Sequence, residues 1–247
     1  MSIIMKTIIV AEIGSNWEGS LAKAKKIITE SKKMGADAVK FQMWRASDLY
    51  KTTHPNWKQI KNSELTFSKA KQIKTFCDKK KIDFFCSAFY PEAVTFLNSL
   101  RVKKFKIASR TCLMKDPFSV ETLKEKANSG KEIIISMGMG GDRNKIKNIF
   151  KKNKTLFCYC ISEYPLKIEK IDWKIAQNYD GFSDHTMDIV APIIFTLLKR
   201  KKNSKQIFIE KHVKLNNSKG PDASTSIDID EFGKMISAIR TIEKLKI

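Results

Sequence analysis

The sequence predicts a (β/α)₈ TIM barrel, formed by a single domain over residues 1–247. Apolar, strand-like runs alternate with helical patterns along the whole chain. The strand-like runs are almost continuously apolar, as in parallel sheets that are buried on both faces. Eight strand–helix units fit a chain of 247 residues without a Pro-, Gly- or Ser-rich linker. A doubly wound sheet, which needs fewer strands, is the alternative fold.

The expected strands and helices follow one another in order. The strands are expected at residues 7–14, 36–42, 83–89, 103–109, 132–138, 155–160, 181–185 and 206–213. The helices are expected at residues 21–34, 67–80, 91–100, 116–130, 145–152, 171–178, 189–201 and 230–246. Ser20 is a suitable N-cap for the first helix, Gly35 a suitable stop, and Pro91 fits a first helical turn. Residues 44–65 are polar and irregular, which predicts a long loop.

The composition excludes several classes of protein. With 42% hydrophobic and 30% charged residues, and no stretch of ~18 apolar residues, the chain is expected to be soluble and to lack a membrane span. The five cysteines show no disulfide framework, which predicts reduced thiols and a cytoplasmic location. The net charge is +21, but the lysines are spread along the chain without a basic, aromatic-rich block. We therefore expect no nucleic-acid partner, although a positive field favours an anionic small substrate.

Polar residues gather at the carboxyl ends of the expected strands, where TIM barrels carry their active sites. Lys40 and Lys106 interrupt apolar strands, although a lysine in a strand is more often a surface residue whose ammonium reaches solvent. The residues at these ends are Glu12, Asn16, Lys40, Gln42, Ser87, Lys106, Ser109, Ser136, Ser162, Glu163, Tyr164, Ser183, Asp184, His185, Glu210, Lys211 and His212.

These residue types indicate a particular chemistry. Two of the three histidines, His185 and His212, end neighbouring strands, and neutral imidazole is a common ligand of divalent metals. Two unrelated histidines, each hydrogen-bonded in a loop, are the alternative. Lysines and serine hydroxyls can hold phosphate and carboxylate groups, and a metal site with open positions can polarise a carbonyl. The combination predicts the condensation of an anionic phosphorylated substrate with a carbonyl compound.

The chain resembles the catalytic barrel of the N-acetylneuraminate (sialic acid) synthase family. The resemblance covers nearly the whole length, and each motif is weak alone but specific in this order. The motifs are residues 11–16 (AEIGSN) with Gly19, 35–42 (GADAVKFQ), 48–50 (DLY), 104–109 (KFKIAS), 136–139 (SMGM), 164–165 (YP), 183–186 (SDHT), 210–212 (EKH) and 220–222 (GPD).

The resemblance implies an enzyme that condenses phosphoenolpyruvate with an N-acetylated amino sugar aldehyde such as N-acetylmannosamine. The products would be a nonulosonic acid and phosphate. Alternatives are a non-catalytic or partner-dependent barrel subunit, and a synthase of a shorter 2-keto-3-deoxy sugar acid. The expected partners are the two substrates and a second copy in a homodimer, with a separate antifreeze-like protein as another candidate.

The resemblance also implies roles for individual residues. His185 and His212 would bind Mn²⁺, with Mg²⁺ or Co²⁺ as alternatives. The phosphoenolpyruvate carboxylate would contact Lys106, Ser87 and Ser109, and its phosphate would face Ser136, Ser162 and Ser183. Glu12, Lys40, Gln42, Tyr164 and Asp222 would line the sugar side. The expected catalytic residues are Glu12, Lys40, Lys106, Asp184 and Glu210, and Asn16 is expected among the substrate-binding residues.

The sequence departs from the family pattern at several positions. Trp17, Tyr90, Thr111 and Ala223 stand where the family usually has polar or acidic residues. Because the sequence stops at Ile247, after the last expected helix, we also expect the antifreeze-like domain of the family to be absent. We expect the loop at residues 44–65, with Trp44, His54 and Trp57, or a separate polypeptide to cover the sugar instead.

Overall fold

The computed structural model describes residues 6–204 and 206–245, and it confirms the (β/α)₈ barrel. Each strand pairs in parallel with the next, and β8 pairs with β1 to close the barrel. A short additional strand, β9 (Ile227–Asp228), pairs with β8 and was not expected. The barrel strands are β1 (Ile8–Gly14), β2 (Ala38–Met43), β3 (Asp83–Ala88), β4 (Lys104–Ile107), β5 (Glu132–Ser136), β6 (Thr155–Tyr159), β7 (Gly181–Asp184) and β8 (Phe208–Lys214).

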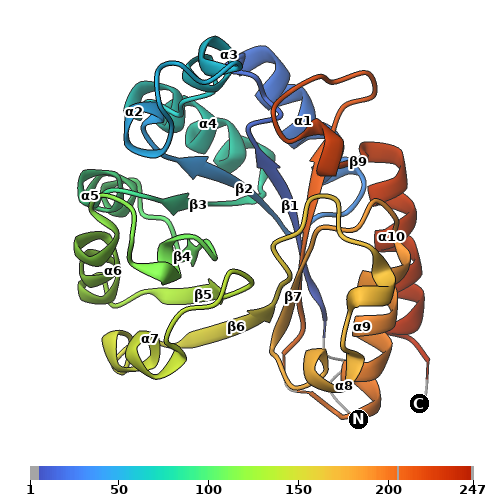
Figure 1. Cartoon of the computed structure of the whole chain (residues 1–247). Helices are drawn as coiled ribbons and strands as arrows, with labels where there is room; N and C mark the ends of the chain where they lie inside the picture. The colour runs from blue at the N-terminus through green and yellow to red at the C-terminus, as the bar shows by residue number, and fades with distance from the viewer. Residues whose placement is uncertain (1–5, 205, 246–247) are drawn as a thin grey trace.

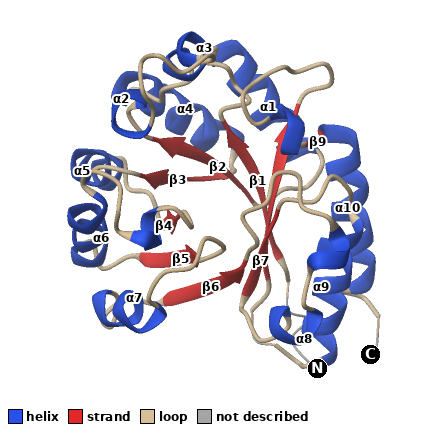
Figure 2. Ribbon diagram, viewed as in Figure 1, coloured by secondary structure: helices blue, strands red, loops and turns tan. Residues whose placement is uncertain are grey.

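Helices form an outer layer around the strands (Figure 2). The longer ones are α1 (Leu21–Lys33), α4 (Phe67–Lys80), α5 (Pro91–Ser99), α6 (Ser119–Asn128), α7 (Arg143–Ile149), α9 (Val190–Lys201) and α10 (Ile229–Ile242). Short helical segments are α2 (Ala46–Leu49), α3 (Trp57–Asn62), α8 (Trp173–Ala176) and the 3₁₀ turns Thr111–Leu113, Ile168–Lys170 and Ala223–Thr225. The last helix ends before the expected residue 246, which lies outside the described residues.

The three expected helix-end signals, Ser20, Gly35 and Pro91, are confirmed. The Ser20 side chain accepts a hydrogen bond from the Lys23 amide and so caps α1. Gly35 follows the C-cap of α1 with a φ of +98°, a conformation that glycine adopts without steric cost. Pro91 occupies the first turn of α5.

The barrel interior is divided into an apolar and a polar half. Alternate residues of the strands form an inner apolar cluster, consisting of Val10, Ala38, Phe85, Ile134, Leu156, Cys158 and Phe208. The residues between them pack outward against the helices in the main hydrophobic core. Because side chains of a strand alternate in direction, the residues two positions beyond the inner cluster also point inward. Those residues are Glu12, Lys40, Ser87, Ser136, Cys160 and Glu210, and the site begins there.

The prediction of an irregular loop at residues 44–65 is wrong. This segment forms α2 and α3, which contact each other near the amino-terminal part of the barrel (Figure 1). Trp44, Ala46 and Ile60 form a small core of their own beneath the two helices, and Trp44 is only 8% exposed. The carboxylate of Glu64 accepts a hydrogen bond from the Ala46 amide and so links the end of the segment to its beginning. Trp44 is therefore a packing residue and is not free to stack on a sugar.

All five cysteines are free in the structure. Over residues 6–204 and 206–245, we find no helix with the length and apolar character needed to cross a membrane.

Candidate active site

Four buried charged side chains from four strands form a cluster at the carboxyl half of the barrel interior. The Lys40 ammonium lies 2.9 Å from Glu12 Oε2 and 3.7 Å from Glu210 Oε1. Lys106 Nζ lies 3.1 Å from Glu210 Oε1. Positive and negative groups thus alternate, which compensates the cost of removing each of them from water. Lys40 and Lys106 are buried inside the barrel and are not surface lysines.

Hydroxyl and amide groups extend this charged cluster. Lys40 donates a hydrogen bond to Ser87 Oγ (3.2 Å), and Lys106 donates one to Ser136 Oγ (2.9 Å). Ser183 donates a hydrogen bond to Glu210 Oε1 (2.9 Å). Gln42 Nε2 donates a hydrogen bond to Glu12 Oε1 (2.7 Å). The structure therefore brings together eight of the predicted site residues, which are Glu12, Lys40, Gln42, Ser87, Lys106, Ser136, Ser183 and Glu210.

The two carboxyl groups of the cluster have opposite pKa shifts. Burial alone would raise the pKa of Glu210, but Lys106 and Lys40 outweigh it and hold this pKa at about 2. Burial raises the pKa of Glu12 to about 7, and the nearby Glu210 contributes in the same direction, while Lys40 opposes it only in part. Glu210 is therefore a permanent anion at neutral pH, and Glu12 is the carboxylate that can gain and release a proton.

The two predicted metal ligands face each other. His185 and His212 are 3% and 8% exposed, and their ring centroids are 5.7 Å apart. His185 Nδ1 lies 2.7 Å from the Ile161 carbonyl, a contact that assigns the proton to Nδ1 and leaves a lone pair on Nε2. Burial lowers the pKa of His212 to about 3, so that this imidazole is neutral.

This arrangement fits a divalent metal ion. The buried Nδ1 of His212 has no hydrogen-bond partner among the described residues. Within the same residues, no group of three or more His, Cys, Asp or Glu side chains is placed to hold an ion. An ion on two imidazoles keeps several coordination positions for substrate oxygens.

Four further predicted residues lie on the loops that follow the strands. The Tyr164 ring packs 4.3 Å from the His185 ring. Ser109 Oγ accepts a hydrogen bond from the Gly138 amide (2.9 Å), and Ser162 Oγ is buried without a partner among the described residues. Asp222 Oδ2 accepts a hydrogen bond from the Ser15 amide (2.7 Å).

Gly14 explains how Asp222 reaches this position. Its φ is +51°, and a Cβ at this residue would lie 2.3 Å from Asp222 Oδ2 and 3.5 Å from Gln42 Nε2. Only a glycine therefore lets the Asp222 carboxylate lie against the end of β1.

Two predicted site residues lie apart from the charged cluster. Asp184 is one residue from both Ser183 and His185, so its side chain points to the opposite face of β7. There its carboxylate is paired with the fully buried Lys211 and accepts hydrogen bonds from Thr186. The expectation of Asp184 as a catalytic residue is therefore corrected to a structural role behind the barrel wall.

Asn16 has a similar structural environment. Its Nδ2 donates hydrogen bonds to the Val213 carbonyl and to Ser226 Oγ, both at 2.8 Å. These contacts tie the end of β1 to β8 and to the segment before β9. Asn16 Oδ1 is buried without a hydrogen-bond partner among the described residues. The role of Asn16 in substrate binding stays a prediction.

The departures from the family pattern at Trp17 and Tyr90 are packing residues. Trp17 is fully buried and contacts Phe41 edge-on, with ring centroids 6.4 Å apart. Tyr90 is 5% exposed and lies beneath the Arg45 guanidinium at 3.9 Å.

Two residues near the site were missed in the sequence. Cys160 Sγ lies 3.6 Å from Ser109 Oγ and 4.0 Å from His185 Nδ1. Burial would raise the pKa of Cys160, but His185 and Lys106 lower it to about 7. Its spacing from Cys158, two residues earlier on the inner face, was the available signal. The other missed residue is Lys126 of α6, which is fully buried behind β3 and β4.

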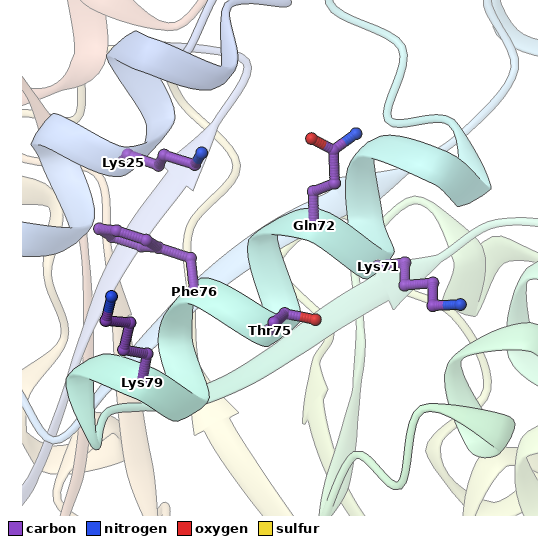
Figure 3. A pocket seen from close by; sticks show the side chains of 6 residues that line it. All are labelled: Lys25, Lys71, Gln72, Thr75, Phe76 and Lys79. Carbon is purple, nitrogen blue, oxygen red and sulfur yellow. The ribbon is translucent and has the colours of Figure 1, made fainter.

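A separate hollow on the outside of the barrel carries none of the site residues. It has a volume of about 370 Å³ and lies between α1 and α4. Figure 3 shows Lys25 reaching toward it from α1, and Phe76 and Lys79 from α4; Gln72, Lys71 and Thr75 complete the lining. Lys25 Nζ lies 5.7 Å from the centre of the Phe76 ring. The lining residues of this hollow include no carboxylate, imidazole or thiol, so they offer none of the usual metal ligands.

Comparisons with known proteins agree on one family. The family model described as the NeuB family matches residues 27–246. An N,N'-diacetyllegionaminic acid synthase of Campylobacter jejuni is 31% identical, over 97% of this chain and 77% of that protein. A pseudaminic acid synthase of the same species is 32% identical, over 96% of this chain and 74% of that protein.

A solved structure agrees with these relatives. The N-acetylneuraminic acid synthetase of Leptospira borgpetersenii, in complex with citrate, superposes with a TM-score of 0.83 and 25% identity, over 98% of this chain and 85% of that chain. The resemblance inferred from the motifs is thereby confirmed, and the chain belongs to the NeuB family.

Proposed function

We propose that this chain, a carbon–carbon bond-forming enzyme of its family, condenses phosphoenolpyruvate with an N-acetylated amino sugar aldehyde. The products are a nonulosonic acid and inorganic phosphate. The observation that carries the proposal is the buried, alternating cluster of Glu12, Lys40, Glu210 and Lys106 at the carboxyl end of the barrel. Buried ammonium groups surrounded by hydroxyls suit a substrate that carries both a carboxylate and a phosphate.

The anionic substrate would bind on the β3–β7 side of the interior. Lys106, Ser87 and Ser109 hold its carboxylate in this proposal, and Ser136, Ser162 and Ser183 face its phosphate. The buried Ser162 hydroxyl, which has no partner among the described residues, is available to donate a hydrogen bond. Lys106 already contacts Ser136, so a bound anion shares a preorganised donor pair.

The sugar aldehyde would bind on the side of Glu12, Lys40, Gln42, Tyr164 and Asp222. Carbon 3 of phosphoenolpyruvate supplies the electron pair of the new carbon–carbon bond, and the aldehyde oxygen becomes a hydroxyl. Glu12, whose pKa is about 7, can supply the proton for that oxygen. Water then adds at carbon 2, and the resulting intermediate expels phosphate by cleavage of its carbon–oxygen bond.

His185 and His212 would hold a divalent ion, for which we propose Mn²⁺. When bound, such an ion supplies Lewis-acid polarisation of a carbonyl oxygen. We expect the wild-type protein to bind one Mn²⁺, measured as the loss of the free-ion EPR signal, and to lose activity on chelation. His185→Ala and His212→Ala should abolish this binding, whereas His54→Ala, which changes the only other histidine, should keep it. Equal Mn²⁺ binding by all three variants would refute the assignment.

The function is tested by incubation with phosphoenolpyruvate, Mn²⁺ and a panel of aldoses, while phosphate release and the keto-acid product are measured. We expect phosphate release that depends on an N-acetylated amino sugar, with one nonulosonic acid formed per phosphate. Phosphate release without an aldose would indicate a phosphatase. Release only with shorter, unacetylated sugars would indicate the synthase of a shorter sugar acid. Either result would overturn the proposal.

A further inference from the structure

Lys126 carries a buried amino group that the proposed chemistry does not use. It belongs to α6, on the outer layer, but its side chain reaches the barrel wall and is fully buried. Its Nζ donates hydrogen bonds to the carbonyls of Ala88 (2.8 Å) and Lys106 (3.0 Å). Among the described residues, no carboxylate lies within ion-pair distance of it, which is unusual for a buried charge.

The two carbonyls belong to strands that carry predicted substrate-binding residues. Ala88 follows Ser87 at the end of β3, and the other carbonyl is that of Lys106 itself. β3 and β4 share a single register pair, Ser87 with Lys106, whereas β4 and β5 share four. The Lys126 amino group therefore joins these two strands beside the one register pair that they share.

The charged and titratable groups around Lys126 determine whether its amino group carries a proton. The groups that act on it are Lys40 of β2 and Lys106 of β4, both cationic, and the thiols of Cys86 in β3 and Cys112 after β4. Burial raises the pKa of both thiols, that of Cys112 to about 12, so they are neutral at physiological pH. Burial, together with the two lysines, lowers the pKa of Lys126 to about 7.

We propose that Lys126 is a positioning residue that joins β3 to β4 behind the anion site and takes up a proton when the anionic substrate binds. This inference rests on the proposed function, which places phosphoenolpyruvate against Lys106 and Ser87. In the charged cluster, Glu12 and Glu210 already accompany Lys40 and Lys106. An arriving carboxylate and phosphate add negative charge, and a protonated Lys126 compensates part of it without touching the substrate.

The test uses phosphoenolpyruvate binding measured by calorimetry at pH 8, in two buffers of different ionisation enthalpy. The variants are Lys126→Met, which removes the hydrogen bonds and the charge, and Lys126→Gln, which keeps donors but not the charge. Lys199→Met is the matched control. Lys199 is also buried and donates to a main-chain carbonyl, that of Gln177 (3.3 Å), which precedes β7 at the opposite end of the barrel.

We expect the wild-type protein and Lys199→Met to take up a fraction of a proton for each phosphoenolpyruvate bound. Both Lys126 variants should lose most of that uptake. Both Lys126 variants should also raise the KM for phosphoenolpyruvate. We expect a rise of about tenfold, which is the change in affinity that corresponds to one pKa unit of lost charge compensation. The KM for the sugar should stay unchanged. Proton uptake that is the same in Lys126→Gln as in wild type would overturn the inference, as would an unchanged KM. Failure of the wild-type protein to bind phosphoenolpyruvate would overturn the proposed function as well. Binding with equal proton uptake in the wild-type protein and all variants would refute only the role of Lys126.

Discussion

At the scale of single residues, the charged cluster links stability to activity. Lys106 contacts both Glu210 and Ser136. Its removal leaves the buried Glu210 carboxylate with the Ser183 hydroxyl at 2.9 Å and, as its nearest cation, Lys40 at 3.7 Å. Breaking a buried ion pair from one side is more costly than replacing both partners, because the remaining charge stays desolvated. This difference allows the structural and the catalytic role of Lys106 to be separated.

We predict that Lys106→Met lowers the free energy of unfolding by about 3 kcal/mol and abolishes turnover. The double variant Lys106→Met, Glu210→Gln should recover most of the stability in urea denaturation but none of the phosphate release. Recovery of activity along with stability would show that Lys106 acts only through folding. Near-normal kinetics in the single variant would contradict its assignment to the substrate carboxylate.

Lys126 gives a second prediction at this scale, about the dependence of stability on pH. Its pKa is lowered from 10.5 to about 7 in the folded protein, so between these values the unfolded chain binds the proton more strongly. The contribution of Lys126 to stability is therefore fully present above pH 10.5 and is lost as the pH falls toward 7.

Relative to Lys126→Met, the wild-type protein should gain stability as the pH rises from 7 to 9.5, by up to about 1.4 kcal/mol per pH unit. Urea denaturation of both proteins across this range measures the difference. The exposed Lys58→Met serves as a control and should follow the wild-type curve. Parallel curves for wild type and Lys126→Met would mean that Lys126 keeps an ordinary pKa.

At the scale of elements, mutations can test whether the segment that forms α2 and α3 contacts the acceptor sugar. Trp57 packs against the core of Trp44, Ala46 and Ile60, while Tyr50, between the two helices, is 37% exposed. Burial raises the pKa of Tyr50, and Asp222, a predicted sugar-side residue, is among the charges that act on it. Because Tyr50 is the more exposed ring, we propose Tyr50, rather than Trp44, as the aromatic side chain of this segment that contacts the acceptor sugar.

We predict that Tyr50→Ala raises the KM for the sugar several-fold without changing stability. Trp57→Ala should raise the same KM indirectly, because loss of a partly buried ring loosens the segment at a cost of about 2 kcal/mol. Hydrogen exchange over residues 46–62 separates the two effects, since only Trp57→Ala should increase it. Both variants should keep the wild-type KM for phosphoenolpyruvate. An unchanged sugar KM in both would remove this segment from the acceptor site.

The elements also show how far the sequence predicts the structure. The strands and most helices follow from apolar periodicity, and the inward direction of Lys40 and Gln42 follows from their spacing of two. The same alternation of side chains along a strand would have placed Asp184 on the outer face of the barrel, because its neighbours Ser183 and His185 both point inward. α2 and α3 were missed because, at four and six residues, they are too short to show a helical period of apolar residues. Lys126 resembled any other lysine on a helix, and only the packing of α6 against β3 and β4 reveals its contacts.

At the scale of the whole molecule, the net charge of +21 creates a positive field that does not depend on any single contact. Such a field raises the association rate of anionic ligands, and salt weakens it as the Debye length falls from about 10 Å at 0.1 M to about 3 Å at 1 M. The charged cluster is buried and contains both signs, so salt should affect it much less than it affects the field outside.

We therefore predict that kcat/KM for phosphoenolpyruvate falls about tenfold when NaCl is raised from 0.05 to 0.5 M, while kcat/KM for a neutral amino sugar changes little. The triple variant Lys25→Gln, Lys71→Gln, Lys79→Gln, at the hollow between α1 and α4, removes charge far from the site. It should shift the salt curve only slightly, because the field is a sum over the surface. Sodium sulfate and sodium chloride should act alike at equal ionic strength if screening is the cause. A stronger effect of sulfate would instead indicate competition for the proposed anion site at Lys106 and its neighbouring serines. A flat salt response would show that the net charge plays no part in substrate capture.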